Sequence, residues 1–276
     1  MEDLIGRQIG PYRVIAPLGR GSMAAIYRAR RAAGDRFVAL KVLPRQLATD
    51  PVFVSRFHQE ALVVANLHHP NILPLEDFGE ADGYTYMAVP LIETGTLADY
   101  LRNQPLPLEQ VFNATRQLCA ALHYAHGLGV VHRDVKPANV LVDEQGTCLL
   151  TDFGVARMLA GTAHLTKTGL AIGTPAYMSP EQGLAGQIDG RSDIYSLGVM
   201  LYQMLTGRLP FDAKKPVELA LKHIYAPAPL PRTFNPALTR EVEQVILKAL
   251  AKQPDARYAT AAELAQALGE TLRGKG

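Results

Sequence analysis

Apolar and polar residues alternate along much of the first ninety residues, which is typical of strands that bury one side in a sheet. The predicted strands cover residues 12–19, 24–30, 36–43, 73–78 and 84–89. Because successive side chains of a strand point to opposite faces, Phe37, Ala39 and Lys41 are expected on one face. A lysine beside a small alanine is unexpected on a purely apolar face.

One helix is predicted between the third and fourth strands. Asp50 and Pro51 are a typical N-cap and first helical residue. Apolar residues then recur at helical spacing, at Phe53, Phe57, Val64 and Leu67. Glu60 lies inside this stripe, and a buried carboxylate needs a cationic partner, for which Lys41 is the candidate. The alternative, in which Glu60 lies at the wet edge of the stripe, stays open.

From Leu108 onward the pattern is mainly helical. Residues 108–129 follow a helical pattern that ends in glycines, and residues 192–207 are apolar on most sides, which indicates a central buried helix closed by Gly207. The pattern therefore predicts an α+β chain with two lobes. A small N-lobe, about residues 1–90, holds an antiparallel sheet and one helix. A hinge, about residues 90–96, joins it to a larger helical C-lobe, about residues 97–276.

Composition limits the cellular setting. The chain has 276 residues, 48% of them apolar and 20% charged, with a formal net charge of +2. This charge is too small to indicate nucleic acid as a partner. Cys119 and Cys148 show neither disulfide nor zinc-site spacing, so we expect a reducing, cytoplasmic compartment. No stretch predicts a signal peptide or a membrane segment, and the cytoplasmic domain of a longer membrane-anchored protein remains an alternative.

A glycine-rich stretch, "LGRGSMAAIYRA" at residues 18–29, raises a question of its own. Gly19 and Gly21 fit a loop whose backbone N–H groups close on a phosphate, but Ala24 stands where G-x-G-x-x-G requires its third glycine. An ordinary glycine-rich hairpin is the alternative. A strand follows the loop, and a dinucleotide-binding Rossmann unit would have a helix there.

Two later motifs carry the chemistry. The chain reads "HRDVKPANVLV" at residues 132–142 and "TDFG" at residues 151–154. With these motifs the sequence resembles the eukaryotic-type (Hanks-type) serine/threonine protein kinases of bacteria, from about Tyr12 to about Leu268. The resemblance implies one protein kinase domain over residues 1–276, with the two-lobed protein-kinase fold. It also implies transfer of the γ-phosphate of Mg-ATP to Ser/Thr hydroxyls of protein substrates, with Mn²⁺ as a substitute metal.

The same resemblance assigns the catalytic and metal-binding residues. Asp134 would accept and orient the substrate hydroxyl, and Lys136 would lie near the γ-phosphate, which favours serine or threonine as acceptor. Asn139 and Asp152 would hold magnesium, which prefers such oxygen ligands. A lone Asp is usually a turn or cap residue, but the surrounding motif makes that reading unsuitable here.

ATP would be bound mainly by the N-lobe. Lys41, held by Glu60, would bind the α- and β-phosphates. The resemblance places further nucleotide contacts at Leu18, Gly19, Gly21, Ser22, Ile26, Ala39, Val89, Pro90, Ile92 and Leu141. Pro90 lacks an N–H, but only its carbonyl is needed, and Ile92 would supply the N–H. Ala24 retains its N–H, so we interpret the glycine stretch as a working phosphate cradle.

Four further residues have supporting roles by resemblance. His132 would pack with Val64, Leu75 and Phe153 rather than act as a base. Glu181 would pair with Arg257, whose planar fork suits a carboxylate. Asp193 would accept backbone N–H groups of the catalytic loop, with a plain N-cap as the alternative.

Residues 153–180 contain the predicted phosphorylation sites and most of the segment predicted to bind the substrate chain. "GTPAYMSPE" resembles the segment that binds the substrate chain, with Thr174 touching Asp134 and Lys136. Thr166 and Thr168 are candidate phosphorylation sites, and Arg133 would capture the added phosphate. A polar loop whose threonines have no role is the alternative. Activation by autophosphorylation, through a transient homodimer, follows from the resemblance.

Two other functions are alternatives to an active kinase. A nucleotide-binding pseudokinase scaffold is supported only by Ala24, because every catalytic group is present. A small-molecule phosphotransferase would leave "GTPAYMSPE" and Arg257 without a purpose.

Overall fold

The structure is a computed structural model that describes residues 4–20, 24–32, 34–43, 51–101, 104–153, 175–184 and 186–273. The chain divides into two compact units, Met1–Glu93 and Thr94–Gly276, here called unit 1 and unit 2. The division falls inside the linking segment expected at residues 90–96.

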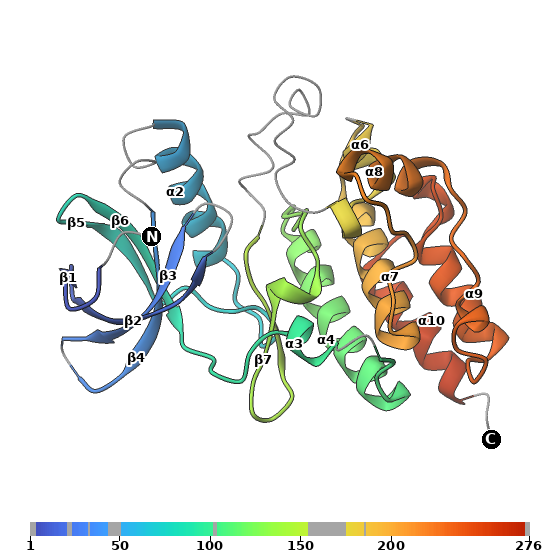
Figure 1. Cartoon of the computed structure of the whole chain (residues 1–276), viewed down its shortest axis with the longest axis horizontal. Helices are drawn as coiled ribbons and strands as arrows, with labels where there is room; N and C mark the ends of the chain where they lie inside the picture. Colours follow the sequence, from blue (N-terminus) through green and yellow to red (C-terminus); the bar gives the residue numbers. More distant parts are fainter. Residues whose placement is uncertain are drawn as a thin grey trace. The chain divides into compact units, whose positions relative to one another are not determined.

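In its described residues, unit 1 is a six-stranded antiparallel sheet with one helix, and the strand order is β1-β2-β3-β4-β6-β5 (Figure 1). Its elements are β1 (Gln8–Ile9), β2 (Tyr12–Arg20), β3 (Ala25–Arg31), β4 (Phe37–Val42), α2 (Pro51–Ala65), β5 (Asp77–Ala81) and β6 (Tyr84–Pro90). This confirms the predicted small lobe. The strand predicted at residues 73–78 is wrong, because β5 begins only at Asp77. Pro74 has no N–H to give to a ladder, which disfavours the earlier start.

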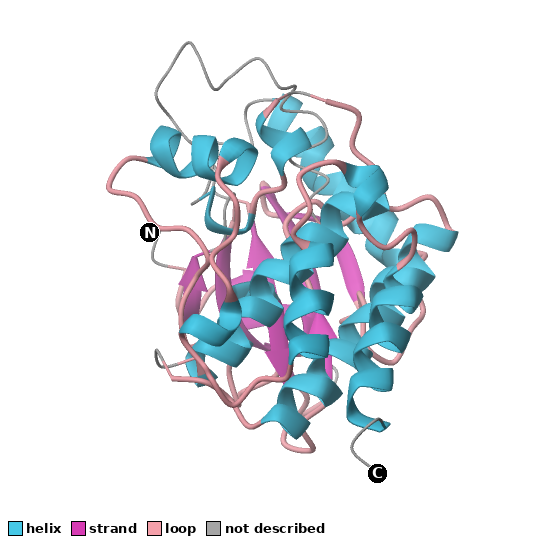
Figure 2. Cartoon of the chain, turned by 90° about the vertical axis from the view of Figure 1, so that its right-hand side faces the viewer, coloured by secondary structure: helices cyan, strands magenta, loops and turns pink. Residues whose placement is uncertain are grey.

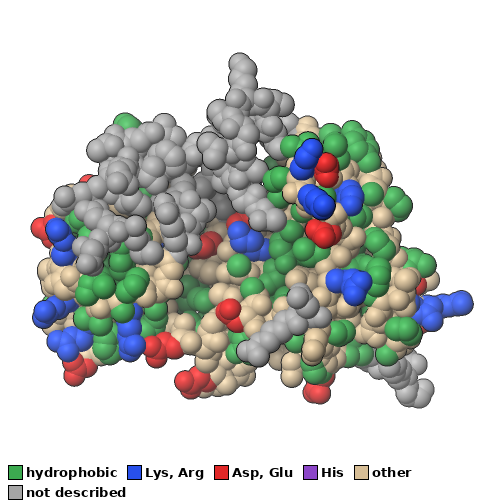
Figure 3. Space-filling model, viewed as in Figure 1, with side chains coloured by type: hydrophobic (Ala, Val, Ile, Leu, Met, Phe, Trp, Pro, Cys, Tyr) green, Lys and Arg blue, Asp and Glu red, His purple; other side chains and the backbone are tan. Residues whose placement is uncertain are grey.

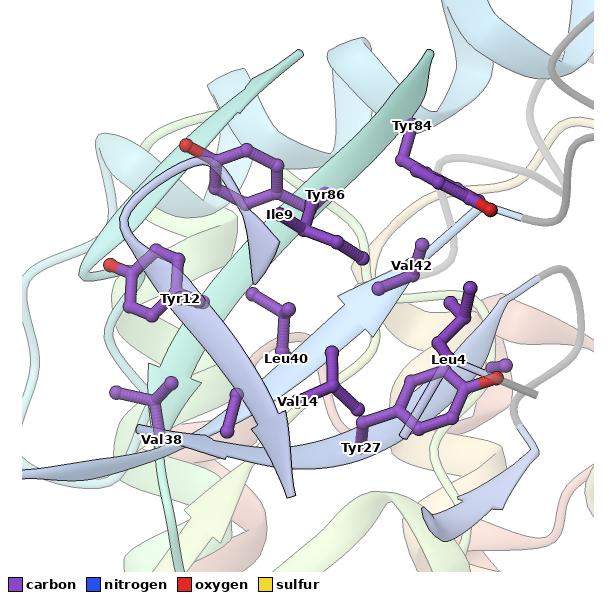
Figure 4. Packing of buried hydrophobic residues seen from close by; sticks show 13 residues of the cluster. Leu4, Ile9, Tyr12, Val14, Tyr27, Val38, Leu40, Val42, Tyr84 and Tyr86 are labelled. Carbon is purple, nitrogen blue, oxygen red and sulfur yellow. The ribbon is translucent and has the colours of Figure 1, made fainter. Parts of the chain in front are cut away.

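Alternation along the strands divides the sheet of unit 1 into two faces. One face carries a buried cluster that includes Val14, Ala29 and Val38, which are direct neighbours in the register (Figure 4). Tyr12 and Tyr86 extend this cluster with an edge-to-face contact whose ring centroids are 5.7 Å apart. The strand residues that alternate with this buried cluster therefore point to the other face of the sheet. The expected nucleotide contacts of unit 1 are among them.

Unit 2 is mainly helical (Figure 2). Its described helices are α3 (Leu97–Tyr100), α4 (Leu108–Gly127), α6 (Pro180–Gly183), α7 (Gly190–Thr206), α8 (Pro216–Tyr225), α9 (Arg240–Ala249) and α10 (Ala261–Arg273). The short pieces are strands β7 (Val140–Val142) and β8 (Cys148–Leu150) and 3₁₀ turns η1 (Pro137–Asn139), η3 (Pro175–Tyr177), η4 (Pro231–Thr233) and η5 (Pro254–Ala256). Helix α7 is buried almost throughout and packs against α4, α9 and α10. It ends at Gly207 with a left-handed φ of 74°, as its sequence predicts.

The packing of α7 against α9 depends on Gly198. A Cβ atom at this position would lie 2.9 Å from the Cβ of Ala249 and 3.4 Å from the carbonyl carbon of the same residue. We therefore expect Gly198→Ala to lower the free energy of unfolding by about 1–3 kcal/mol through overpacking. Urea unfolding measures this change. Gly127→Ala is the control, because nothing lies within 4 Å of a Cβ there, and equal stability of the two variants would contradict the packing argument.

Candidate active site

The loop between α4 and η1 is held by a buried carboxylate from α7. Asp193 is fully buried, and its two oxygens accept hydrogen bonds from the backbone N–H groups of His132, at 2.8 Å, and Arg133, at 2.7 Å. The Nε2 atom of His126 lies 2.8 Å from the same carboxylate. Asp193 is therefore not the N-cap of α7. That position belongs to Asp189, whose side chain accepts from the N–H of Arg191.

The backbone of this loop adopts a strained conformation at Arg133, where φ is 67°. A left-handed conformation costs a residue with a Cβ about 1–2 kcal/mol. Such strain persists only where surrounding contacts impose it, and it concentrates at functional sites. Here Asp193 holds the N–H of Arg133, and the side-chain amide of Gln182 donates to its carbonyl at 2.8 Å.

His132 is a buried member of this loop. Its ring centroid lies 4.6 Å from that of Phe153, its Nδ1 accepts from the N–H of Asp134 at 3.2 Å, and its Nε2 lies 3.0 Å from the carbonyl oxygen of Thr151. Because Nδ1 accepts, Nε2 is the nitrogen that carries the proton and donates. Both ring nitrogens of His132 are thus engaged in hydrogen bonds and the ring packs against Phe153, as expected of a packing residue. The expected contacts with Val64 and Leu75, which belong to unit 1, stay a prediction.

The carboxylate of Asp134 accepts hydrogen bonds from two side chains. The ammonium of Lys136 donates to Oδ2 at 2.7 Å, and the amide nitrogen of Asn139 lies 3.1 Å from the same oxygen and 2.8 Å from the Asp134 carbonyl oxygen. The side chains of Asp134 and Lys136 keep 20% and 28% of their surface exposed. A carboxylate that is held in place and still reaches solvent can accept a proton from an incoming hydroxyl.

The two expected metal ligands lie on neighbouring segments. The β7–β8 pairing sets Val140 opposite Leu150, and the N–H of Thr151 donates to the carbonyl of Asn139 at 3.0 Å, one residue before Asp152. Because the amide nitrogen of Asn139 faces Asp134, its amide oxygen is the atom suited to a hard cation. In the part of the chain that the structure describes, no group of three His, Cys, Asp or Glu side chains could hold a metal. The Asn139–Asp152 pair would thus need phosphate or water oxygens to complete a magnesium shell.

In unit 1, the expected nucleotide contacts share one face of the sheet. Lys41 lies opposite Ile26 and Met87, and Ala39 lies opposite Val89. Gly19 pairs with Ile26 at the end of β2. Leu141 belongs to unit 2, where its strand β7 forms a bridge to Thr96, so its meeting with these residues stays a prediction.

Helix α2 packs on the same face as Lys41. Met87, the register partner of Lys41, belongs to a buried cluster with Phe57 and Ala61 of α2. Ala24 is 1% exposed and belongs to this cluster too. Its methyl group thus has a packing role, independent of the phosphate cradle that the sequence suggests. Glu60 lies within α2, but its side chain is outside the described residues, so the pairing with Lys41 stays a prediction.

Glu181 and Arg257 form a buried bidentate ion pair. The two guanidinium nitrogens each lie 2.7 Å from one carboxylate oxygen, and the hydroxyl of Ser192 donates to Glu181 at 2.6 Å. Arg257 also donates to three backbone carbonyls and lies over the ring of Tyr195. Burial alone would raise the pKa of the Glu181 carboxyl, but the hydrogen bonds and charge of Arg257, with the Ser192 hydroxyl, hold that pKa below its ordinary value. The pair ties α6 to the segment before α10.

The sequence did not predict the roles of two residues of this site, Gln182 and His126. Gln182 is the third residue of α6 and forms a capping box with Ser179, a spacing that sequence reasoning can detect. The contact of Gln182 with Arg133 has no sequence signal, because 49 residues separate the two. His126 is likewise unmarked in the sequence, and a Cβ on Gly190 would come within 2.6 Å of its Nδ1 atom. Gly190 therefore makes room for the imidazole that contacts Asp193.

Other expected site residues lie outside the described residues. These are Gly21, Ser22, Thr166, Thr168 and Thr174. Leu18, Pro90 and Ile92 are described, the first exposed and the other two half-buried.

Known proteins are similar to this chain over most of its length. Residues 12–268 match the family model described as protein kinase domain. The chain is 41% identical to serine/threonine-protein kinase PrkC of Bacillus subtilis over 95% of its own length and 40% of that protein. It is 40% identical to serine/threonine-protein kinase PknB of Mycobacterium leprae, over 90% of this chain and 40% of that protein. The chain thus spans about 40% of the length of these relatives.

A solved structure is similar over the whole fold. The PknI kinase domain of Mycobacterium tuberculosis gives a TM-score of 0.76 at 30% identity, covering 97% of this chain and 98% of that one. Among the described helices, none is both long and apolar enough to cross a membrane.

Proposed function

This chain belongs to the protein kinase domain family, and from that premise we propose that it transfers the γ-phosphate of ATP to serine and threonine hydroxyls of proteins. The observation that carries the proposal is the arrangement around Asp134. Its carboxylate is held by Lys136 and Asn139 on a loop whose backbone is fixed by Asp193.

The chemistry assigned to each residue follows from phosphoryl transfer, in which proteins mainly position groups and stabilise charge. Asp134 orients the acceptor hydroxyl and takes its proton as the oxygen–phosphorus bond forms. Lys136, 2.7 Å from the carboxylate, supplies a cation beside the transferring phosphate. ADP leaves with the electron pair of the broken bond.

Magnesium fits the residues of unit 2 and would be held by the amide oxygen of Asn139 and the carboxylate of Asp152. When bound, it would neutralise charge on the phosphate oxygens. The backbone link from Thr151 to Asn139 fixes the spacing between the two segments that carry these ligands. Lys41 would bind the α- and β-phosphates, and its place on the sheet face where α2 packs is consistent with a pairing to Glu60.

Protein substrates are favoured over small molecules by the surface of unit 2. Large apolar side chains are exposed on and next to α6 and α8 (Figure 3), namely Leu184, Val217, Leu221, Tyr225 and Leu230. Exposed large apolar side chains are enriched at surfaces that bind other proteins. A small-molecule phosphotransferase would not need them.

The regulatory part of the proposal is autophosphorylation at Thr166 or Thr168 through a transient homodimer. It is supported by the position of both threonines between Asp152 and Glu181, and by Arg133, a cation next to Asp134. We also propose a cytoplasmic location, which the two buried thiols of Cys119 and Cys148 support.

Peptide phosphorylation tests the proposed function. Three basic peptides that differ only in a Ser, Thr or Tyr acceptor are incubated with the protein and radiolabelled Mg-ATP. We expect label on the Ser and Thr peptides, loss of label with EDTA, and recovery with added Mg²⁺ or Mn²⁺. ATP binding without transfer to any peptide or basic protein would instead indicate a pseudokinase scaffold, and preferential Tyr labelling would contradict the assignment of Lys136.

A further inference from the structure

We propose that Gln182 is a positioning residue for Asp134. Its side-chain amide holds the peptide group that joins Arg133 to Asp134, with the amide nitrogen 2.8 Å from the Arg133 carbonyl oxygen. The inference rests on the proposed function, because it gives Gln182 a part in placing the group that accepts the substrate proton.

The orientation of the Gln182 amide is settled by its partners. Its Oε1 atom lies 2.9 Å from the backbone nitrogen of Ser179 and 3.2 Å from the Ser179 hydroxyl. A backbone N–H can only donate, and the carbonyl of Arg133 can only accept. The amide oxygen must therefore face Ser179, and the NH₂ group must face Arg133.

The peptide group that Gln182 contacts is held at its other end too. The N–H of Asp134 donates to Nδ1 of His132, and the two preceding N–H groups are held by Asp193. Rotation of this peptide group changes ψ of Arg133 and φ of Asp134, and therefore turns the side chain of Asp134. Gln182 opposes that rotation through the carbonyl, and so sets the direction in which the chain reaches Asp134.

A purely structural role for Gln182 would be its capping box with Ser179 at the start of α6. The two roles predict opposite effects of Gln182→Glu. Glutamate caps a helix start at least as well as glutamine. An ionised glutamate side chain cannot donate a hydrogen bond to the Arg133 carbonyl, however. It also places a carboxylate oxygen next to that carbonyl oxygen, and the two oxygens repel each other.

The experiment therefore compares Gln182→Glu with Gln182→Met, which removes both the cap and the donor without adding charge. We expect kcat to fall by about tenfold or more in Gln182→Glu, and by about threefold to tenfold in Gln182→Met, from the worth of one hydrogen bond and its repulsive replacement. KM for ATP should stay within about twofold in both, because the nucleotide contacts are elsewhere.

Gln117→Glu is the matched control. Gln117 makes the same kind of contacts away from the loop, donating to the Gly146 carbonyl and accepting from the N–H of Cys148. Its substitution should lower the melting temperature and leave kcat within about twofold. A purely structural role would be indicated by equal losses of kcat in the two Glu variants, or by a Gln182→Glu protein at least as active as Gln182→Met.

Hydrogen–deuterium exchange separates this inference from the proposed function. In Gln182→Glu, the backbone amides of residues 132–134 should exchange faster than in wild type, and in Gln117→Glu they should not. If the wild type transferred no phosphate, the proposed function would fail, and the exchange result would still decide whether Gln182 holds the loop. Unchanged exchange in Gln182→Glu would overturn the inference.

Discussion

Asp134→Asn should lower kcat for phosphate transfer by about 10²- to 10⁴-fold and leave ATP binding within about twofold, since the loss is that of a general base. Asparagine has the same shape, but its amide cannot take the proton of the acceptor hydroxyl. It also removes the negative charge that the Lys136 ammonium contacts at 2.7 Å. Initial rates with a Ser peptide, together with ATP titration of each protein, measure the two effects.

Asp143→Asn is the matched control for this experiment. Asp143 lies nine residues after Asp134, in the turn between β7 and β8, where its carboxylate accepts from the N–H groups of Gln145 and Thr147. It has no assigned part in the chemistry, so its kcat should match that of wild type. An Asp134→Asn protein that kept the wild-type kcat would refute the role given to this carboxylate.

Arg257→Leu should lower the free energy of unfolding by about 3–5 kcal/mol, because it leaves the Glu181 carboxylate buried without its cation. Arg257 is 4% exposed, and its guanidinium donates both hydrogen bonds of the bidentate pair. Replacing both partners, as Glu181→Met with Arg257→Leu, should restore part of the lost stability, since no uncompensated charge then remains. Urea unfolding at pH 7 compares the three proteins.

The folding stabilities of wild type and of Arg257→Leu should change with pH in opposite directions. In wild type the pKa of Glu181 is held below its ordinary value of 4.5, so the pair adds stability above that value and loses it as the pH falls through the folded pKa. Without Arg257, burial raises the pKa of this carboxyl instead, so the variant loses stability as the pH rises above 4.5. The difference between the two proteins should therefore grow from about pH 4 to pH 7. A constant difference would contradict the assigned ion pair.

Local sequence signals were sufficient for most of the fold. Alternation predicted β2, β3 and β4, and the glycine after residue 206 predicted the end of α7. These features depend on backbone geometry and on which side chains are apolar, and both are visible in a short window. The start of β5 at Asp77 was missed because an apolar run containing Pro74 looks like a strand until its ladder partners are known.

The site contains contacts that no short window could provide. The sequence leaves a plain N-cap as the alternative role of Asp193, and only the fold shows that Asp189 caps α7 while Asp193 holds a loop 60 residues earlier. The same is true of Ala24, which the sequence marks as an altered glycine position and the structure places against Phe57 and Ala61. Replacing it by glycine would remove one buried methyl group, worth about 0.8 kcal/mol. Long-range contacts therefore decide the role of Asp193 and show a packing role for Ala24 that motif spacing does not reveal.

Phosphosite mapping tests the central claim most directly. Purified wild type and Asp134→Asn are incubated with Mg-ATP, with and without a basic protein, and phosphorylated residues are identified by mass spectrometry. We predict phosphate on Thr166 or Thr168 and on Ser or Thr of the added protein with wild type only. Wild-type protein that binds ATP yet leaves every Ser and Thr unmodified, its own included, would contradict the assignment as an active serine/threonine kinase.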